Sequence, residues 1–221
     1  MRTVVVTGGA KGIGKAVAER FGEDRVEAGG RDMLDVTDEE AVAAFFERVG
    51  TVDVLVNNSG VAEGAPLTRT TLHSWRHHFE VNATGAFLCT RAVLPGMLER
   101  GKGRIVTVAS TAGLRGARYT AAYTAAKHAA VGLMRATAAE VAGSGVTANA
   151  VCPGWVRTAM MERAVGRITE TTDRDEQQAE AALVAQMPLG RALEPEEVAE
   201  AVWFLASPEA AAINGQTVEL A

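Results

Sequence analysis

The chain has 221 residues, 48% of them hydrophobic, which is enough to build one compact domain with a substantial core. Its formal net charge is −5 and its arginines and lysines are scattered, so we expect neither a nucleic acid nor an anionic membrane as a partner. Cys89 and Cys152 stand in apolar surroundings, and we expect two free thiols in a reducing cytoplasm. No secretory pattern precedes the first strand, and no apolar run approaches transmembrane length.

The first predicted elements are a strand, a glycine turn and a helix. Residues 3–7 form a short β-branched run that predicts a buried strand, and residues 15–21 have a helical pattern. Gly8, Gly12 and Gly14 lie between the two. Such glycines let the backbone approach a pyrophosphate, and the helix N-terminus supplies amide donors. Three glycines at one strand–helix junction argue against a plain turn and for a dinucleotide site.

The rest of the chain alternates between strand and helix patterns, which predicts a parallel sheet with helices on both faces. We expect further strands at residues 25–28, 52–56, 104–109, 145–152 and 216–220. We expect helices at residues 39–49, 68–100, 121–141 and 195–206. Residues 155–188 are charged and less regular, and we interpret them as a substrate lid on a single domain that spans residues 1–221.

Three polar groups stand out between the strand at 104–109 and the helix at 121–141. Tyr123 and Lys127 are four apart, so they share one helix face, and Ser110 directly follows the strand. A lysine beside a tyrosine favours the phenolate, so we expect a lowered pKa for the Tyr123 phenol and proton transfer near neutral pH. The alternative is an ordinary exposed helix pair.

A metal site is not expected. His73 and His77 are four apart on one amphipathic segment, so a metal pair is conceivable. No third ligand follows at a useful spacing, and a solvated helix face is the better interpretation.

In their order along the chain, these motifs resemble those of the short-chain dehydrogenase/reductase family. The resemblance implies an NAD(P)-dependent oxidoreductase with a Rossmann-type doubly wound sheet. Its implied catalytic residues are Asn82, Ser110, Tyr123 and Lys127. The implied cofactor-binding residues are Gly8, Lys11, Gly12, Ile13, Gly14, Arg31, Asp35, Val36, Asn58, Ser59, Gly60, Tyr123, Lys127, Pro153, Gly154, Val156 and Thr158.

The resemblance also implies a role for each catalytic residue. Ser110 polarises a substrate carbonyl, Tyr123 gives that oxygen a proton, and Lys127 holds the nicotinamide ribose and stabilises tyrosinate. Asn82 holds a water that connects Lys127 to solvent. Tyr119 is a rival phenol, but no lysine stands four residues after it, and we interpret it as a pocket-lining residue.

One departure from the family pattern is large. In the family, a strand, a helix and another strand separate the regions that correspond here to Gly30-Arg31 and to Asp35-Val36. A parallel crossover needs roughly a dozen residues or more, and only three residues separate Arg31 from Asp35. We therefore expect six strands rather than seven, with one outer strand and its helix missing after residue 31, and a more open adenine pocket.

Cofactor choice rests on the end of the second strand. NAD-binding relatives place an acidic side chain there, which accepts bonds from the ribose 2′-hydroxyl. This chain has Gly30, followed by Arg31, and Lys11 adds a second positive charge, so we expect NADP(H), with NAD possible. Asp32 complicates this prediction because it could also approach the ribose.

Residues 101–140 and 149–161 resemble 3-oxoacyl thioester and polyketide ketoreductases, which predicts reduction of a small-molecule β-keto substrate. The alternatives are an oxidative alcohol, diol, sugar-alcohol or hydroxybutyrate dehydrogenase, and a non-enzyme that senses dinucleotide or serves as a scaffold. The family commonly pairs the long helices that fall here at residues 71–100 and 121–141. We therefore expect a homodimer or homotetramer.

Overall fold

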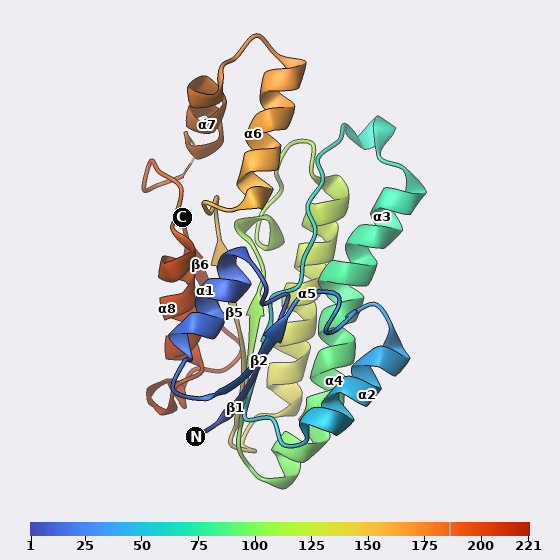
Figure 1. Cartoon of the computed structure of the whole chain (residues 1–221), viewed down its shortest axis with the longest axis vertical. Coiled ribbons are helices and arrows are strands. Elements are labelled where there is room, and N and C mark those ends of the chain that lie inside the picture. Colours follow the sequence, from blue (N-terminus) through green and yellow to red (C-terminus); the bar gives the residue numbers. More distant parts are fainter. Residues whose placement is uncertain (186) are drawn as a thin grey trace.

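The protein is described by a computed structural model that covers residues 1–185 and 187–221, and its sheet has six parallel strands (Figure 1). These strands are β1 (Thr3–Thr7), β2 (Arg25–Gly29), β3 (Val54–Asn57), β4 (Gly103–Val108), β5 (Val146–Pro153) and β6 (Thr217–Leu220). They pair in the order β2-β1-β3-β4-β5-β6, and every pairing is parallel. From β1 the chain adds β2 on one side and β3 to β6 on the other, so the winding direction changes between β1 and β3. This confirms the prediction of a doubly wound α/β fold.

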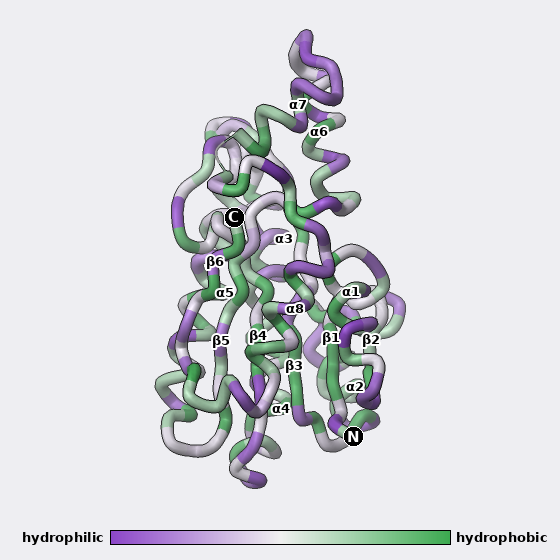
Figure 2. Tube along the Cα trace, turned by 90° about the vertical axis from the view of Figure 1, so that its left-hand side faces the viewer, coloured by the Kyte–Doolittle hydropathy of each residue, from purple (hydrophilic) through white to green (hydrophobic). Residues whose placement is uncertain are grey.

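Helices cover both faces of the sheet. α1 (Gly12–Arg20) and α8 (Pro195–Leu205) pack on one face, while α2 (Glu39–Val49), α4 (Gly85–Glu99) and α5 (Ala121–Glu140) pack on the other (Figure 1). Side chains alternate accordingly: Val4 and Val6 join the core under α1 and α8, whereas Val5 joins the opposite core. Because neither face meets water, the central strands are almost continuously apolar (Figure 2).

The missing crossover is confirmed at the edge of the sheet. After β2 the chain makes a tight turn in which the amides of Met33 and Leu34 both donate to the Gly30 carbonyl oxygen, each at 3.1 Å. Leu34 and Val36 are then buried in the core beneath α2 and α4. These two side chains thus fill part of the space that the missing strand and helix would occupy. As a result, β2 is the edge strand of the sheet.

The segment predicted as one mostly helical stretch at 68–100 is divided. It contains a 3₁₀ turn η1 (Leu67–Arg69), α3 (Leu72–Phe79), a π-helical turn η2 (Glu80–Thr84) and α4. Pro95 lies inside α4. Asn82 lies in the π-helical turn and is buried, and such turns occur frequently at functional sites.

Residues 155–188 are more regular than the sequence indicated. They contain α6 (Ala159–Thr171) and α7 (Glu176–Val184), which extend beyond the carboxyl edge of the sheet at the top of Figure 1. A short parallel bridge between Val156 and Leu193 joins the two ends of this excursion. Two further 3₁₀ turns, η3 (Thr111–Gly113) and η4 (Pro208–Ala210), complete the fold.

Both cysteines are buried free thiols, as predicted. Within the described residues, every helix is too short or too polar to cross a membrane.

Candidate active site

Ser110, Tyr123 and Lys127 meet at the carboxyl end of β4. Tyr123 and Lys127 stand one turn apart on α5, and the Lys127 Nζ lies 5.9 Å from the centroid of the Tyr123 ring. Lys127 is buried and its Nζ donates to the Val108 carbonyl oxygen at 2.9 Å, which fixes the ammonium at the end of β4. The Ser110 Oγ accepts from the Ala112 amide at 3.1 Å, so the hydroxyl hydrogen stays free to donate.

Burial controls the ionisation of this group. It raises the pKa of Tyr123 above its ordinary value, and a hydrogen bond from the Ser110 hydroxyl opposes that rise. Burial also lowers the pKa of Lys127 to about 8. The expected lowering of the Tyr123 pKa was therefore wrong for this structure, because burial raises this pKa more than the Ser110 hydrogen bond lowers it.

Asn82 uses its carboxamide to hold the chain that follows β3. Its Oδ1 accepts from the Val61 amide at 3.2 Å, and its Nδ2 donates to the carbonyl oxygens of Val61 and His78 at 3.0 and 2.9 Å. Gly60 lies in the narrow space beside it. A Cβ at Gly60 would stand 2.9 Å from Asn82 Oδ1 and 3.5 Å from Lys127 Nζ, so a glycine is needed there.

The glycine turn between β1 and α1 is tightly built. A Cβ at Gly14 would stand 2.3 Å from the Gly8 carbonyl oxygen, and Gly8 has a left-handed φ of 65°. The Asn58 Nδ2 donates to the carbonyl oxygens of Thr7 and Gly8 at 2.9 and 3.2 Å, which ties this turn to the end of β3.

The first turn of α1 fits a bound pyrophosphate. Lys11 stands at the N-cap position without any side-chain cap, so the amides that follow it keep their donors. Thr158 comes from the segment after β5, and its methyl group would lie 3.1 Å from a Cβ on Gly12. Among the described residues, the buried ammonium of Lys127 donates to one carbonyl oxygen and pairs with no carboxylate. It can therefore donate to ribose hydroxyls as well. These features fit a nicotinamide dinucleotide.

The residues predicted to meet the adenosine end of the cofactor lie on the short connection after β2. Arg31 and Asp35 form an ion pair at 2.7 Å, and the Arg31 side chain is 79% exposed. Hydrogen bonds from Thr37 and Arg31 hold the pKa of Asp35 below its ordinary value. The Asp32 carboxylate lies over Gly30, 2.8 Å from where a Cβ would stand. A cation and an acid thus both stand at the position from which we predicted cofactor choice.

The other predicted cofactor residues lie around the same edge. Ile13 is in the first turn of α1, and the Ser59 amide donates to Thr7 Oγ1 at 3.0 Å. Val36 and Val156 are buried, so their side chains pack in the core. Pro153 ends β5, and the Gly154 amide donates to the Leu220 carbonyl oxygen at 2.7 Å.

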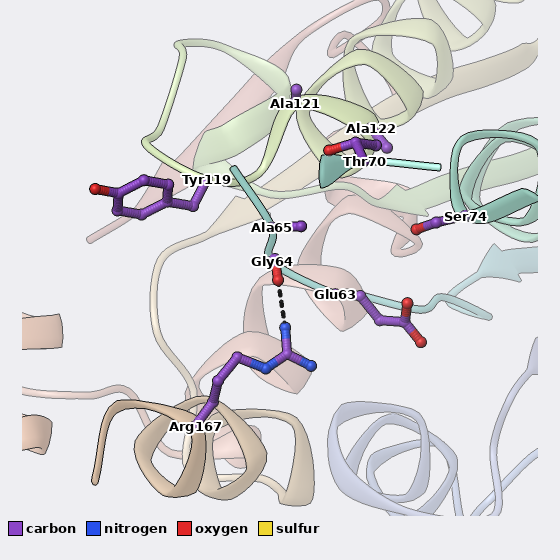
Figure 3. A pocket seen from close by; sticks show the side chains of 9 residues that line it. All are labelled: Glu63, Gly64, Ala65, Thr70, Ser74, Tyr119, Ala121, Ala122 and Arg167. Carbon is purple, nitrogen blue, oxygen red and sulfur yellow. Dashed lines mark hydrogen bonds between the residues drawn. The ribbon is translucent and has the colours of Figure 1, made fainter. Parts of the chain in front are cut away.

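A pocket of about 140 Å³ opens at the N-terminal end of α5, where Ala121 and Ala122 precede Tyr123 in the chain. It is lined by Glu63, Gly64, Ala65, Thr70, Ser74, Tyr119, Ala121, Ala122 and Arg167 (Figure 3). Arg167 reaches from α6 and donates to the Gly64 carbonyl oxygen at 2.6 Å. Tyr119 lines the pocket as predicted, although its ring is turned outward in Figure 3 and is 59% exposed.

Sequence reasoning missed one buried residue of this site, His78. Its side chain is 0% exposed and its ring meets the Tyr123 ring edge-on, with centroids 6.3 Å apart and an interplanar angle of 73°. The available signal was its spacing, four residues before Asn82 on a predicted helix. His73 and His77 instead stack on each other with centroids 6.4 Å apart.

Known proteins that are similar to this chain are described as reductases. A family model described as enoyl-(acyl carrier protein) reductase matches residues 15–220. A Streptomyces coelicolor protein described as a ketoacyl reductase is 39% identical, covering 98% of this chain and 94% of its own. The 3-oxoacyl-[acyl-carrier-protein] reductase FabG of Vibrio cholerae is 37% identical, covering 99% and 95%. A crystal structure of a single-site variant of actinorhodin polyketide ketoreductase with NADPH has a TM-score of 0.91 and 35% identity, covering 99% and 95%.

Proposed function

We propose that the chain, which belongs to the short-chain dehydrogenase/reductase family, reduces a ketone to a secondary alcohol with NADPH. The observation that carries this proposal is the meeting of Ser110, Tyr123 and Lys127 at the end of β4, beside an uncapped helix N-terminus. The relatives named as ketoacyl and 3-oxoacyl reductases support a β-keto acyl substrate.

Each catalytic side chain has a role that follows from its environment. The Ser110 hydroxyl donates to the ketone oxygen and draws electron density from the carbonyl carbon. Tyr123 keeps its proton in the free protein because burial raises its pKa, so the phenol is ready to act as the acid. It transfers that proton to the developing alkoxide oxygen. Asn82 retains one lone pair on Oδ1 for a water that returns a proton toward Lys127.

The cofactor-binding residues divide between the two ends of the dinucleotide. When bound, NADPH supplies the hydride. The α1 N-terminus holds the pyrophosphate, Lys127 holds the nicotinamide ribose, and Arg31 with Lys11 meets the 2′-phosphate. Titration of Lys127 near its pKa of about 8 then affects both ribose binding and the stability of tyrosinate.

The proposal extends to the surroundings of the site. Helices α6 and α7 serve as the substrate lid, since Arg167 already joins α6 to the pocket wall. The two free thiols support a reducing compartment such as the cytoplasm. Exposed apolar side chains on α4 support assembly into a homodimer or homotetramer.

A test is to follow the absorbance of NADPH with a panel of β-keto thioesters, cyclic diketones and simple ketones. We expect consumption of NADPH with at least one β-keto compound. The reverse reaction is run with diols, sugar alcohols and hydroxybutyrate in the presence of NADP⁺. Turnover of these alcohols alone, or of nothing in either panel while NADPH binds, contradicts the proposal.

A further inference from the structure

The wall of the pocket is a segment without regular secondary structure, residues 61–65, which we call the wall segment. Its backbone polar groups form hydrogen bonds with other parts of the site rather than within a helix or sheet of their own. Asn82 binds both the amide and the carbonyl of Val61, and the Tyr119 carbonyl oxygen accepts from the Ala65 amide at 2.7 Å. Arg167 donates to the Gly64 carbonyl oxygen. The shape of the pocket therefore depends on these anchors.

His78 supplies the anchor in the middle of the wall segment. Its Nε2 lies 3.0 Å from the Glu63 amide, which can only donate, so Nε2 must be an acceptor. Its Nδ1 lies 2.7 Å from the Ser74 carbonyl oxygen, which can only accept, so Nδ1 must carry the hydrogen. Both contacts thus require the same neutral tautomer, and the fully buried ring has no access to water as a substitute partner.

The same residue connects the wall segment with two catalytic groups. The His78 carbonyl oxygen accepts from Asn82 Nδ2, and the His78 ring packs edge-on against Tyr123. We propose that His78 is a positioning residue that holds the wall segment in register with Tyr123 and thereby determines how the ketone binds. This inference rests on the proposed function, and it concerns binding of the ketone rather than binding of the cofactor.

Two substitutions by amide side chains distinguish the hydrogen bond at Nε2 of His78 from the one at Nδ1. In His78→Gln the longer side chain can place an oxygen near the Nε2 position and accept from Glu63. In His78→Asn the shorter side chain can reach only the Ser74 carbonyl oxygen. His77→Asn is the matched control, because His77 lies on the same helix and stacks on His73 instead. Thermal unfolding and NADPH affinity of every variant show whether the fold and the cofactor site are intact.

The first readout does not depend on activity. Amide hydrogen exchange measured by NMR should show Glu63 protected in the wild-type protein and in His78→Gln, and exchanging about tenfold faster in His78→Asn. The ¹⁵N shifts of the His78 ring should report a hydrogen on Nδ1 and a lone pair on Nε2. Unchanged Glu63 exchange in His78→Asn, or the opposite tautomer, overturns the inference even if the protein turns over no ketone.

The second readout uses the ketone identified in the assay. We expect His78→Asn to raise KM for the ketone about tenfold, while kcat and the dissociation constant of NADPH change by less than about threefold. His78→Gln should recover most of the lost affinity, and His77→Asn should match the wild type. Equal damage in His78→Asn and His78→Gln overturns the inference, because it shows that only the volume of the ring matters.

Discussion

Tyr123 is the single residue on which the proposed chemistry most depends. Tyr123→Phe removes only the phenolic oxygen, so the fold and NADPH binding should persist. Turnover should fall by about two orders of magnitude or more, because general acid catalysis is typically worth that much. Steady-state NADPH consumption measures it, with Tyr119→Phe as the control for the other tyrosine of the chain. A Tyr123→Phe protein with more than about a tenth of wild-type turnover contradicts the assignment.

Lys127 makes a prediction about stability and pH. Its pKa is about 8 in the folded protein and 10.5 ordinarily, so between these values the unfolded chain binds more protons. The free energy of unfolding should therefore rise with pH across this window, as the cost of a buried ammonium disappears. Relative to that of Lys127→Met, the free energy of unfolding of the wild type should rise by about 2 kcal/mol between pH 8 and pH 10.

Urea unfolding at several pH values measures this difference. Burial raises the pKa of Tyr123 in the folded protein, and the titration of this phenol in the unfolded chain is common to both proteins, so it cancels from their difference. Parallel pH profiles for the wild type and Lys127→Met would show that the ammonium is not buried at a cost.

At the scale of the elements, the six strands could be predicted from apolar runs, and the missing crossover from the family resemblance together with a count of residues. The π-helical turn at η2 could not, because a long helical pattern does not show where one extra residue is accommodated. Helices α6 and α7 were also missed, since their surfaces are largely polar and their burial is shallow. One readable signal remained unused: Asp175 and Gln178 form a capping box at the start of α7.

In the candidate site, too, some residues could be predicted from the sequence and others could not. That Ser110, Tyr123 and Lys127 lie together could be predicted, and so could the glycine turn, because residue type and spacing along the chain indicate both. His78 and Arg167 could not, because each acts on the wall segment through a tertiary contact, 15 and 103 residues away in sequence. The spacing of His78 four residues before Asn82 is a local signal for its place in the site, but no local pattern encodes its contact with Glu63 or that of Arg167 with Gly64.

The shortened connection after β2 makes a prediction about cofactor choice. Arg31 is exposed at the cofactor edge but paired with Asp35, so its charge is only partly available to a phosphate. Arg31→Ala should still raise KM for NADPH several-fold more than KM for NADH, because the 2′-phosphate loses its cationic partner. Steady-state kinetics with both cofactors measure it. Arg25→Ala, which removes an arginine from the opposite end of the same edge strand, is the control.

A wild-type protein with higher catalytic efficiency for NADH than for NADPH would contradict this argument. Asp32 is then the residue that reads the ribose, since its carboxylate lies over Gly30.

At the scale of the whole molecule, the exposed faces of α4 and α5 predict self-association. Phe87 and Leu98 on α4 are each 42% exposed. Ala136 and Ala139 are exposed on α5, and they are not among the alanines of this helix that are buried. These two small side chains permit close approach of another helix.

We predict a dimer or tetramer, and light scattering at micromolar concentration measures its mass against the 23.1 kDa of one chain. Phe87→Glu should shift the protein toward monomer, because a carboxylate in an apolar interface loses its water, and this cost remains even with Arg91 one helical turn away. Leu67→Glu, at a 71% exposed position before α3, should leave the mass unchanged. A wild-type mass of one chain contradicts the prediction, and so does an unchanged assembly in Phe87→Glu.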